Sequence, residues 1–338
     1  MSFVLGDFYV SAPNRWGGSS TAAQTGRHPA LWRANTFIPV MNSGTIIGQM
    51  WIIFALSAAL LASFNPVINK RLLSDTDVTV VAWAGQAFGL PLLALNLILF
   101  FGPVPRVDGC FFIGILGSAI LNTLAHLAAT QALKDGDASI VAPLFVFSPA
   151  VTLLVSSFTL REIPQPLPLM GVGLMMIGAY LLALSSWHEA FEPLRAFVHQ
   201  RALWLAIVAS VLWGITPVFE KTAIQHTFPE NPTAAAFGAL LALTLVLFPI
   251  MLSRARHPFT QVRTHLRGFV ALGVIGGIAP LFGYAAFSLG LIGYVSALFK
   301  MSSVFALLWA FLFLGEKDMP RRLPGALVMV IGAILIAV

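Results

Sequence analysis

From about residue 50 to its end, the chain alternates long apolar stretches with short polar connections. Each apolar stretch holds about 20 residues, the length that an α-helix needs to cross the hydrocarbon core of a bilayer. Backbone polar groups inside lipid must be satisfied within their own segment, so such stretches are predicted to be helices. The pattern therefore predicts an all-α polytopic membrane protein with ten transmembrane helices. The predicted spans are 50–70, 79–101, 111–133, 138–160, 167–187, 202–223, 233–253, 268–288, 292–314 and 322–338.

The first 46 residues do not follow this pattern. They hold Arg15, Arg27 and Arg33 among Gly, Ser, Thr and Pro, and they contain no apolar run long enough to span a bilayer. The apolar stretch and cleavage site of a signal peptide are also missing. We expect residues 1–46 to be a disordered tail. Two alternatives stay open: a weak targeting peptide, and a spurious extension before a start at Met41 or Met50.

Composition supports the membrane assignment. Of 338 residues, 58% are hydrophobic and 9% are charged, whereas about a quarter are charged in a soluble domain. The net charge of +6 is gathered in short clusters between the apolar runs, where Lys and Arg act as topology signals. The expected partner is therefore the lipid bilayer and not a nucleic acid. The single cysteine, Cys110, excludes an intramolecular disulfide and a multi-cysteine metal site.

The second part of the chain repeats the first. The segment GVGLMMIGAYLLAL at 171–184 matches GALVMVIGAILIAV at 325–338 at seven of fourteen positions, with both glycines in register. The same offset of 154 pairs Glu162 with Glu316 and Gly136 with Gly290. Near the start of each half, NPVINK at 65–70 corresponds to TPVFEK at 216–221 with an offset of 151. We predict two five-helix halves, 47–187 and 201–338, joined by a linker at 188–200.

An odd number of helices in each half has a mechanical consequence. The second half then enters the membrane from the opposite side, so the two copies form an inverted repeat. Inverted repeats allow a carrier to open to either side by exchanging the conformations of its halves. The glycines Gly171, Gly178, Gly325 and Gly332 are expected to let the fifth and tenth helices pack closely. The architecture favours transport of a small solute.

Other classes of membrane protein lack their sequence signatures here. An ATP-driven pump needs a G-x-x-x-x-G-K-[ST] loop, which is missing. An enzyme needs a catalytic pairing such as Ser with His, and the one predicted intramembrane histidine has no carboxylate partner among the predicted spans. A channel filter is also missing. A non-transporting sensor or scaffold stays open as the alternative, because such proteins need no chemical signature.

At this point the sequence resembles the drug/metabolite transporter superfamily, in its ten-helix form with two EamA repeats. The resemblance is carried by residues 132–162 with the following GVGLMMIGAYLLAL, by SLGLIGYVSALFKMSSVFALLWAFLFLGE at 288–316, and by LWG at 212–214. It covers the chain from Met50 to the end. The resemblance implies an inner-membrane carrier without bound cofactor or metal, which exports amino acids, metabolites or toxic compounds from a cavity between the halves.

Lys300 is the leading candidate for substrate binding. It lies about 12 Å into its predicted span, where a lysine facing lipid would cost about 2.5–3.5 kcal/mol. Ser296 and Ser303 stand at i−4 and i+3 and would share its helix face. A cation lining a cavity would attract a carboxylate or phosphate. The structural alternative is a lysine that donates to backbone carbonyls.

Further polar residues are candidates for the cavity wall. In the third helix, Asn122 and His126 lie four residues apart on one face. His126 is a candidate to carry a proton in coupled transport. The alternative is that its side chain forms a hydrogen bond to a neighbouring helix. Trp213 stands just before Gly214. We expect its ring either to form the floor of a cavity or to pack between helices. The related residues Asn65 and Thr216 stand just before prolines, where a helix is expected to kink.

The distribution of acidic residues selects the substrate class. Glu162, Glu220 and Glu316 fall at predicted span ends, and Lys221 is expected to extend to the interface. No carboxylate is thus predicted in mid-membrane. We predict a secondary carrier of a small anionic or zwitterionic metabolite such as an organic acid or amino acid, and the resemblance implies that it is an exporter. A multidrug exporter is the alternative within transport, and a homodimer is left open.

Overall fold

The computed structural model describes residues 46–101, 105–135, 141–183, 201–314 and 319–338. The predicted tail lies outside this part of the chain except for Ile46, and the predicted linker at 188–200 lies outside it entirely.

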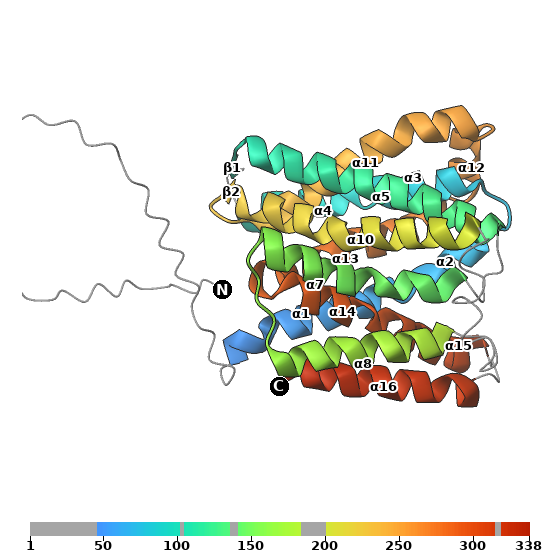
Figure 1. Ribbon diagram of the computed structural model, residues 1–338. Helices are drawn as coiled ribbons and strands as arrows, with labels where there is room; N and C mark the ends of the chain where they lie inside the picture. Colours follow the sequence, from blue (N-terminus) through green and yellow to red (C-terminus); the bar gives the residue numbers. More distant parts are fainter. Residues whose placement is uncertain (1–45, 102–104, 136–140, 184–200, 315–318) are drawn as a thin grey trace, which may run out of the picture. The chain divides into compact units, whose positions relative to one another are not determined.

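Helices make up nearly all of the described structure (Figure 1). Two short strands, β1 (Arg106–Val107) and β2 (Thr227–Phe228), pair antiparallel at one end of the helices. The helices before residue 200 are α1 (Ile46–Ala62), α2 (Asn65–Leu72), α3 (Val78–Ala87), α4 (Leu90–Phe101), α5 (Gly109–Asp135), the 3-10 helix η1 (Ala142–Phe147), α7 (Ser148–Thr159) and α8 (Pro166–Ala183). The later ones are α10 (Arg201–Gln225), α11 (Pro232–Arg254), α12 (Pro258–Thr264), α13 (Leu266–Leu289), α14 (Ile292–Phe299), α15 (Met301–Leu314) and α16 (Met319–Ala337).

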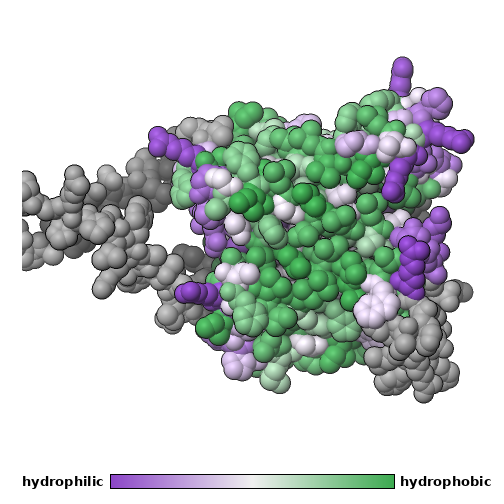
Figure 2. Space-filling view, turned by 45° about the horizontal axis from the view of Figure 1, so that its top comes forward, coloured by the Kyte–Doolittle hydropathy of each residue, from purple (hydrophilic) through white to green (hydrophobic). Residues whose placement is uncertain are grey.

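The protein is an all-α membrane protein. Within the described residues, seven helical segments are long and apolar enough to cross a bilayer, and shorter apolar helices lie at Gln49–Ala62 and Pro143–Thr159. Figure 2 shows a broad apolar band with hydrophilic residues at its two ends. Large apolar side chains such as Ile98 and Phe158 are 72% and 80% exposed. Such a surface is stable only where lipid replaces water.

Several predicted spans are interrupted. The stretch 50–70 divides between α1 and α2, just before Asn65, and 292–314 divides between α14 and α15 at Lys300. In 138–160, the 3-10 helix η1 gives way to α7 at Ser148. Proline follows Asn65 and Ser148 in the sequence, and it removes a backbone donor from the helical ladder. Backbone interrupted at membrane depth is tolerated where it lines a cavity or is buried in protein.

Helices α8 and α16 pack closely through the four glycines singled out in the sequence. A Cβ atom on Gly171 would lie 2.6 Å from the carbonyl oxygen of Gly332, and one on Gly178 would lie 2.6 Å from that of Gly325. Only glycine permits backbones this close. The packing role predicted for these glycines is confirmed.

A buried ion pair ties three segments together near the ends of α7, α10 and α13. Lys221 Nζ lies 2.6 Å from Glu162 Oε1, and the two side chains are only 11% and 9% exposed. Lys221 also donates to the carbonyl oxygen of Gly290 at 2.8 Å, and Glu162 Oε2 accepts from the backbone N–H of Ile292 at 2.9 Å. The prediction that Lys221 extends to the interface was wrong, because its charge is satisfied inside the protein.

Candidate functional site

A cavity of about 510 Å³ lies among α1, α2, α3, α7, α10, α13, α14 and α15. Three of the helix interruptions reach its wall, since Asn65, Ser148 and Lys300 all line it. Its polar or ionisable lining consists of Asn65, Gln86, Ser148, Thr152, Trp213, Glu220, Tyr284, Ser296, Lys300 and Ser302. The wall therefore combines both charge signs with hydroxyl and amide groups inside an apolar membrane domain.

Lys300 lines this cavity from the junction of α14 and α15. Its Nζ donates to the carbonyl oxygen of Phe145 at 3.3 Å, so one of its three protons is used by the protein. Both sequence-based interpretations are thus represented in the geometry: Lys300 faces the cavity and also bonds a backbone carbonyl. Two donor positions remain for a bound anion.

The predicted serine stripe is only half present. Ser296 is 8% exposed and lines the cavity. Ser303 is exposed and does not line the cavity, and Ser302 lines it instead. The expected i+3 relation of Ser303 to Lys300 assumes one continuous helix, whereas α14 ends at Phe299 and α15 begins at Met301. The interruption changes which side chain turns inward.

Two cavity residues have buried polar atoms without a partner. Ser296 Oγ and Asn65 Oδ1 make no hydrogen bond to the protein. Buried polar atoms in native structures almost always have a partner, which can be water or a ligand. The two atoms are therefore suited to bind a polar substrate or the water that precedes it.

Trp213 also lines the cavity, and aromatic neighbours hold its ring. The rings of Phe145 and His126 pack edge-on against it, with centroids 5.4 Å and 5.3 Å away. Gly214 lies against α7, since a Cβ there would stand 2.7 Å from the carbonyl oxygen of Ser148. Thr152 Oγ1 donates to the Gly214 carbonyl at 2.8 Å, which fixes α7 against α10. Trp213 thus serves both of its proposed roles, on the wall and in packing.

His126 and Thr216 do not line the cavity. The His126 side chain is exposed on α5 and approaches the site only through Trp213. Thr216 is buried, and its Oγ1 donates to the carbonyl of Leu212 at 2.8 Å in its own helix. Its hydroxyl is therefore satisfied within α10, and the neighbouring Pro217 lines the cavity instead.

Glu220 is the main residue that sequence reasoning missed. It lies inside α10, more than one turn before that helix ends at Gln225, and it lines the same cavity as Lys300. Ser118 Oγ donates to Glu220 Oε1 at 3.0 Å, and Asn122 Nδ2 donates to Ser118 Oγ at 3.4 Å. Asn122 thus supports the wall from behind. Glu220 lies towards the end of its span, as predicted, but its carboxylate lines the cavity, which was not expected.

A sequence signal for Glu220 did exist. Trp213, Pro217 and Glu220 follow one another at spacings of four and three residues, which places them on one face of α10. All three line the cavity. Because Trp213 was already a candidate for the cavity wall, the same face pointed to Glu220.

The charges of Lys300 and Glu220 are not paired with each other. Among the described residues, ion pairs join Lys221 with Glu162 and His226 with Asp108. A lysine and a carboxylate on one cavity wall therefore remain free to interact with a solute.

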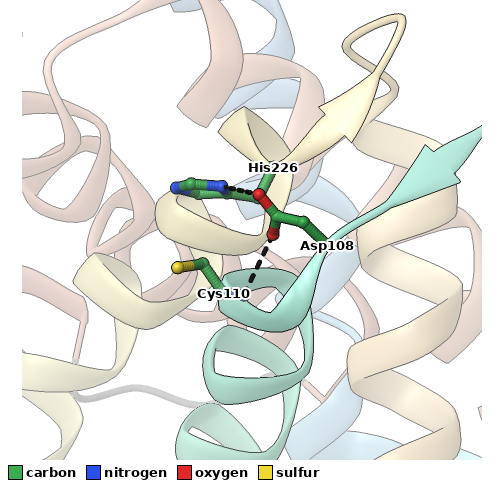
Figure 3. Close-up of side chains that lie close together, drawn as sticks. All are labelled: Asp108, Cys110 and His226. Atoms are coloured by element: carbon green, nitrogen blue, oxygen red, sulfur yellow. Dashed lines mark hydrogen bonds and ion pairs between the residues drawn. The ribbon is translucent and has the colours of Figure 1, made fainter.

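A cluster of possible metal ligands lies outside the cavity, where α5 begins and α10 ends. Asp108, Cys110 and His226 each place a ligand atom within 4.8 Å of the others (Figure 3). Sulfur, imidazole nitrogen and carboxylate oxygen are ligand types of Zn²⁺. Protein contacts already account for Asp108, since Oδ1 accepts from the backbone N–H groups of Cys110 and Phe111, and Oδ2 lies 2.7 Å from His226 Nδ1. The hydrogen bond from His226 holds the pKa of Asp108 below its usual value.

Known proteins place this architecture in a family. The EamA-like transporter family matches residues 49–184 and again 200–338. An uncharacterized protein of Methanocaldococcus jannaschii is 32% identical over 95 residues, which cover 28% of this chain and 69% of that protein. A solved crystal structure with a TM-score of 0.69 covers 84% of this chain and 95% of its own at 15% identity, a likeness that concerns the fold alone. The chain therefore belongs to the EamA-like transporter family of the drug/metabolite transporter superfamily, as a multi-pass secondary transporter and not an enzyme.

Proposed function

We propose that the protein carries a small zwitterionic or anionic metabolite, such as an amino acid or organic acid, and that it works as an exporter. The main support is the presence of Lys300 and Glu220, unpaired with each other, on the wall of one cavity. A desolvated charge without a partner is costly. A substrate carboxylate at Lys300 would offset one such cost, and a substrate ammonium at Glu220 would offset the other. The zwitterion is therefore the first choice within this class.

The proposed mechanism is an exchange between two inverted five-helix halves, 47–187 and 201–338, which together supply the ten predicted spans. Its support comes from matched positions in the repeat. Ser148 and Ser302 are related by the same offset of 154 that relates Glu162 to Glu316, and both line the cavity beside a helix interruption. The two halves would then present equivalent helix ends to the substrate from opposite sides.

The repeat does not extend to the charges. The residue that corresponds to Lys300 at this offset is Val146, and the one that corresponds to Glu220 at the offset of 151 is Asn69. The backbone exchange is then symmetric while the substrate contacts are supplied mainly by the second half. Such a carrier can open to the other side of the membrane while the same two charged residues continue to bind the substrate.

The test is counterflow in proteoliposomes loaded with one candidate solute. The panel contains amino acids, organic acids, sugar phosphates and organic cations, and the proteins are wild type, Lys300→Met and Glu220→Gln at matched reconstitution. We expect the wild type to exchange amino acids and the Lys300→Met variant to lose this exchange. Exchange of organic acids alone would retain the anionic class. Exchange of organic cations that survives in Lys300→Met would replace the proposal with a multidrug exporter, which Glu220 would serve.

A further inference from the structure

A second hollow, of about 660 Å³, lies where α2 meets α12 and α13. The hollow is lined by four basic side chains, which are Arg71, Arg263, His265 and Arg267. No acidic residue of the described part of the chain lines it. Within the described residues, the three guanidinium groups form no ion pair or side-chain hydrogen bond. The hollow is therefore a concentration of positive charge that the protein itself leaves uncompensated.

Packing beneath the hollow explains why the arginines gather there. Leu72 at the end of α2 and Phe269 in the first turn of α13 belong to one buried cluster. Gly268 allows the close approach, because a Cβ atom there would stand 2.8 Å from Leu72 Cδ2. Arg71 precedes Leu72 and Arg267 precedes Gly268, so the same contact brings both arginines to the hollow.

Electrostatics favour an anion in this place. Like charges held together repel one another, and three guanidinium groups match the bidentate geometry of phosphate oxygens. The start of α13 and the ends of α2 and α12 all lie at the hollow, so their helix dipoles oppose one another and the positive potential comes from the basic side chains. An anion would therefore remove repulsion and gain several charge-assisted hydrogen bonds.

The surroundings point to a lipid as the source of that anion. The hollow lies at one end of membrane-spanning helices, beside apolar side chains that face outward: Leu266 and Val270 are each 47% exposed. A phospholipid headgroup could enter the hollow while its acyl chains lie along these residues. Basic pockets between transmembrane helices commonly recognise anionic headgroups in this way.

We propose that this hollow, formed by Arg71, Arg263, His265 and Arg267, binds the phosphate of an anionic phospholipid. The site joins α2, which belongs to the first predicted half, to α12 and α13, which belong to the second. A bound lipid therefore bridges the two parts of the carrier. The site is separate from the Lys300 cavity and does not depend on the identity of the transported solute.

The test measures lipid binding by the full-length protein in neutral detergent, by native mass spectrometry with phosphatidylglycerol and phosphatidylcholine. The wild type is expected to bind phosphatidylglycerol saturably and in preference to phosphatidylcholine. The variant Arg71→Gln/Arg263→Gln/Arg267→Gln is expected to bind it at least about tenfold more weakly, since each basic side chain near an anionic lipid adds to the attraction. These side chains are exposed, so folding should be retained, which thermal unfolding in the same detergent checks.

The matched control is Arg201→Gln/Arg321→Gln/Arg322→Gln, which removes the same charge away from the hollow. Its binding of phosphatidylglycerol should equal that of the wild type. Equal losses in both variants would reduce the effect to net charge and overturn the proposal, as would equal affinity of the wild type for both lipids. Inorganic phosphate is the third arm: full displacement of the lipid by millimolar phosphate would identify the site as one for free phosphate.

Discussion

Two neighbouring residues of α10, Glu220 and Lys221, end in different electrostatic regions of the molecule. Glu220 faces the cavity, where it accepts a hydrogen bond from the Ser118 hydroxyl and interacts with the neighbouring Tyr284 and Asn122. Lys221 turns away from it, because consecutive residues of an α-helix point about 100° apart. It meets Glu162 and the carbonyl of Gly290 in the protein interior. In the proposed mechanism, one helix thus supplies a charge for a solute and a charge for the fold.

The difference lies in how each charge is satisfied. Lys221 and Glu162 carry opposite charges, and each also forms a hydrogen bond with a backbone group, at Gly290 and Ile292 respectively. The pair can therefore remain buried. Lys300 and Glu220 lie on a common wall without pairing. A paired buried charge holds structure, whereas a charge left unpaired on a cavity wall requires a ligand. We therefore expect partner geometry to separate structural residues from transport residues.

The repeat carries the same residue types at the positions that correspond to the ion pair. Lys70 corresponds to Lys221, Glu316 to Glu162 and Gly136 to Gly290. Gly136 and the side chains of Lys70 and Glu316 lie outside the described part of the chain. The charged pair is thus duplicated in the sequence, while the cavity charges Lys300 and Glu220 are not.

The largest expected effect comes from breaking the ion pair. Lys221→Met should lower the free energy of unfolding by about 3–5 kcal/mol, because it leaves Glu162 buried without its cation. Thermal and denaturant unfolding in detergent measure the change. The double variant Glu162→Gln/Lys221→Met should recover much of the loss. A Lys221→Met protein as stable as wild type but inactive in transport would break the comparison, since the pair would then serve transport and not the fold.

Lys300→Met should have the opposite profile. The loss of a charged hydrogen-bonding partner, worth about 1.5–3 kcal/mol, should reduce substrate affinity by one to two orders of magnitude. Stability should change little or increase, because a cation leaves the membrane interior. Substrate-induced thermal shifts and counterflow report the two quantities separately. Destabilisation equal to that of Lys221→Met would make Lys300 a structural residue.

Glu220→Gln sharpens the comparison within the cavity. The amide keeps the shape and the hydrogen bond from Ser118 but removes the charge. We expect the preference for an amino acid over the corresponding organic acid to fall by about tenfold, the effect of one charged contact. Competition by both solutes in counterflow measures this ratio. Glu220→Asp serves as the control that keeps the charge, and an unchanged ratio in Glu220→Gln would assign the carboxylate to packing.

The smallest effect is expected at the Asp108–His226 pair, whose side chains are 43% and 34% exposed. The His226 hydrogen bond lowers the pKa of Asp108 from its usual value of 3.8. A carboxyl with a depressed pKa adds stability above its unfolded pKa and loses it as the pH falls through the folded pKa. The small difference between wild type and Asp108→Asn should therefore be present at neutral pH and vanish below pH 3.8. A difference that grows on acidification would contradict this assignment.

Much of the fold could be predicted from periodicity and length alone. The apolar runs correctly indicated membrane helices, and the glycine register of 171–184 against 325–338 correctly indicated the close packing of α8 on α16. Helix interruptions were harder to predict. The run 292–314 appears as one apolar helix, because a single lysine does not by itself indicate that the helix is interrupted at Lys300.

The candidate site was predicted in part. Lys300, Ser296, Trp213 and Asn65 line the cavity, and Asn122 supports it, whereas Ser303, His126 and Thr216 do not. The causes differ: the helix interruption at Lys300 turns Ser303 outward, and His126 lies on an exposed face of α5. Thr216 bonds its own helix, and local spacing cannot distinguish that outcome from a cavity position.

The sequence by itself determined the class of the protein, its repeat and its glycine-mediated helix packing, because these depend on residue composition and local period. Only the tertiary structure decided which charges are paired. Glu220 and Lys221 are adjacent in the chain, yet the partners that distinguish them come from residues 118, 162 and 290. A charge inside a membrane protein takes its role from the groups that surround it, and those groups are brought together by packing between distant segments.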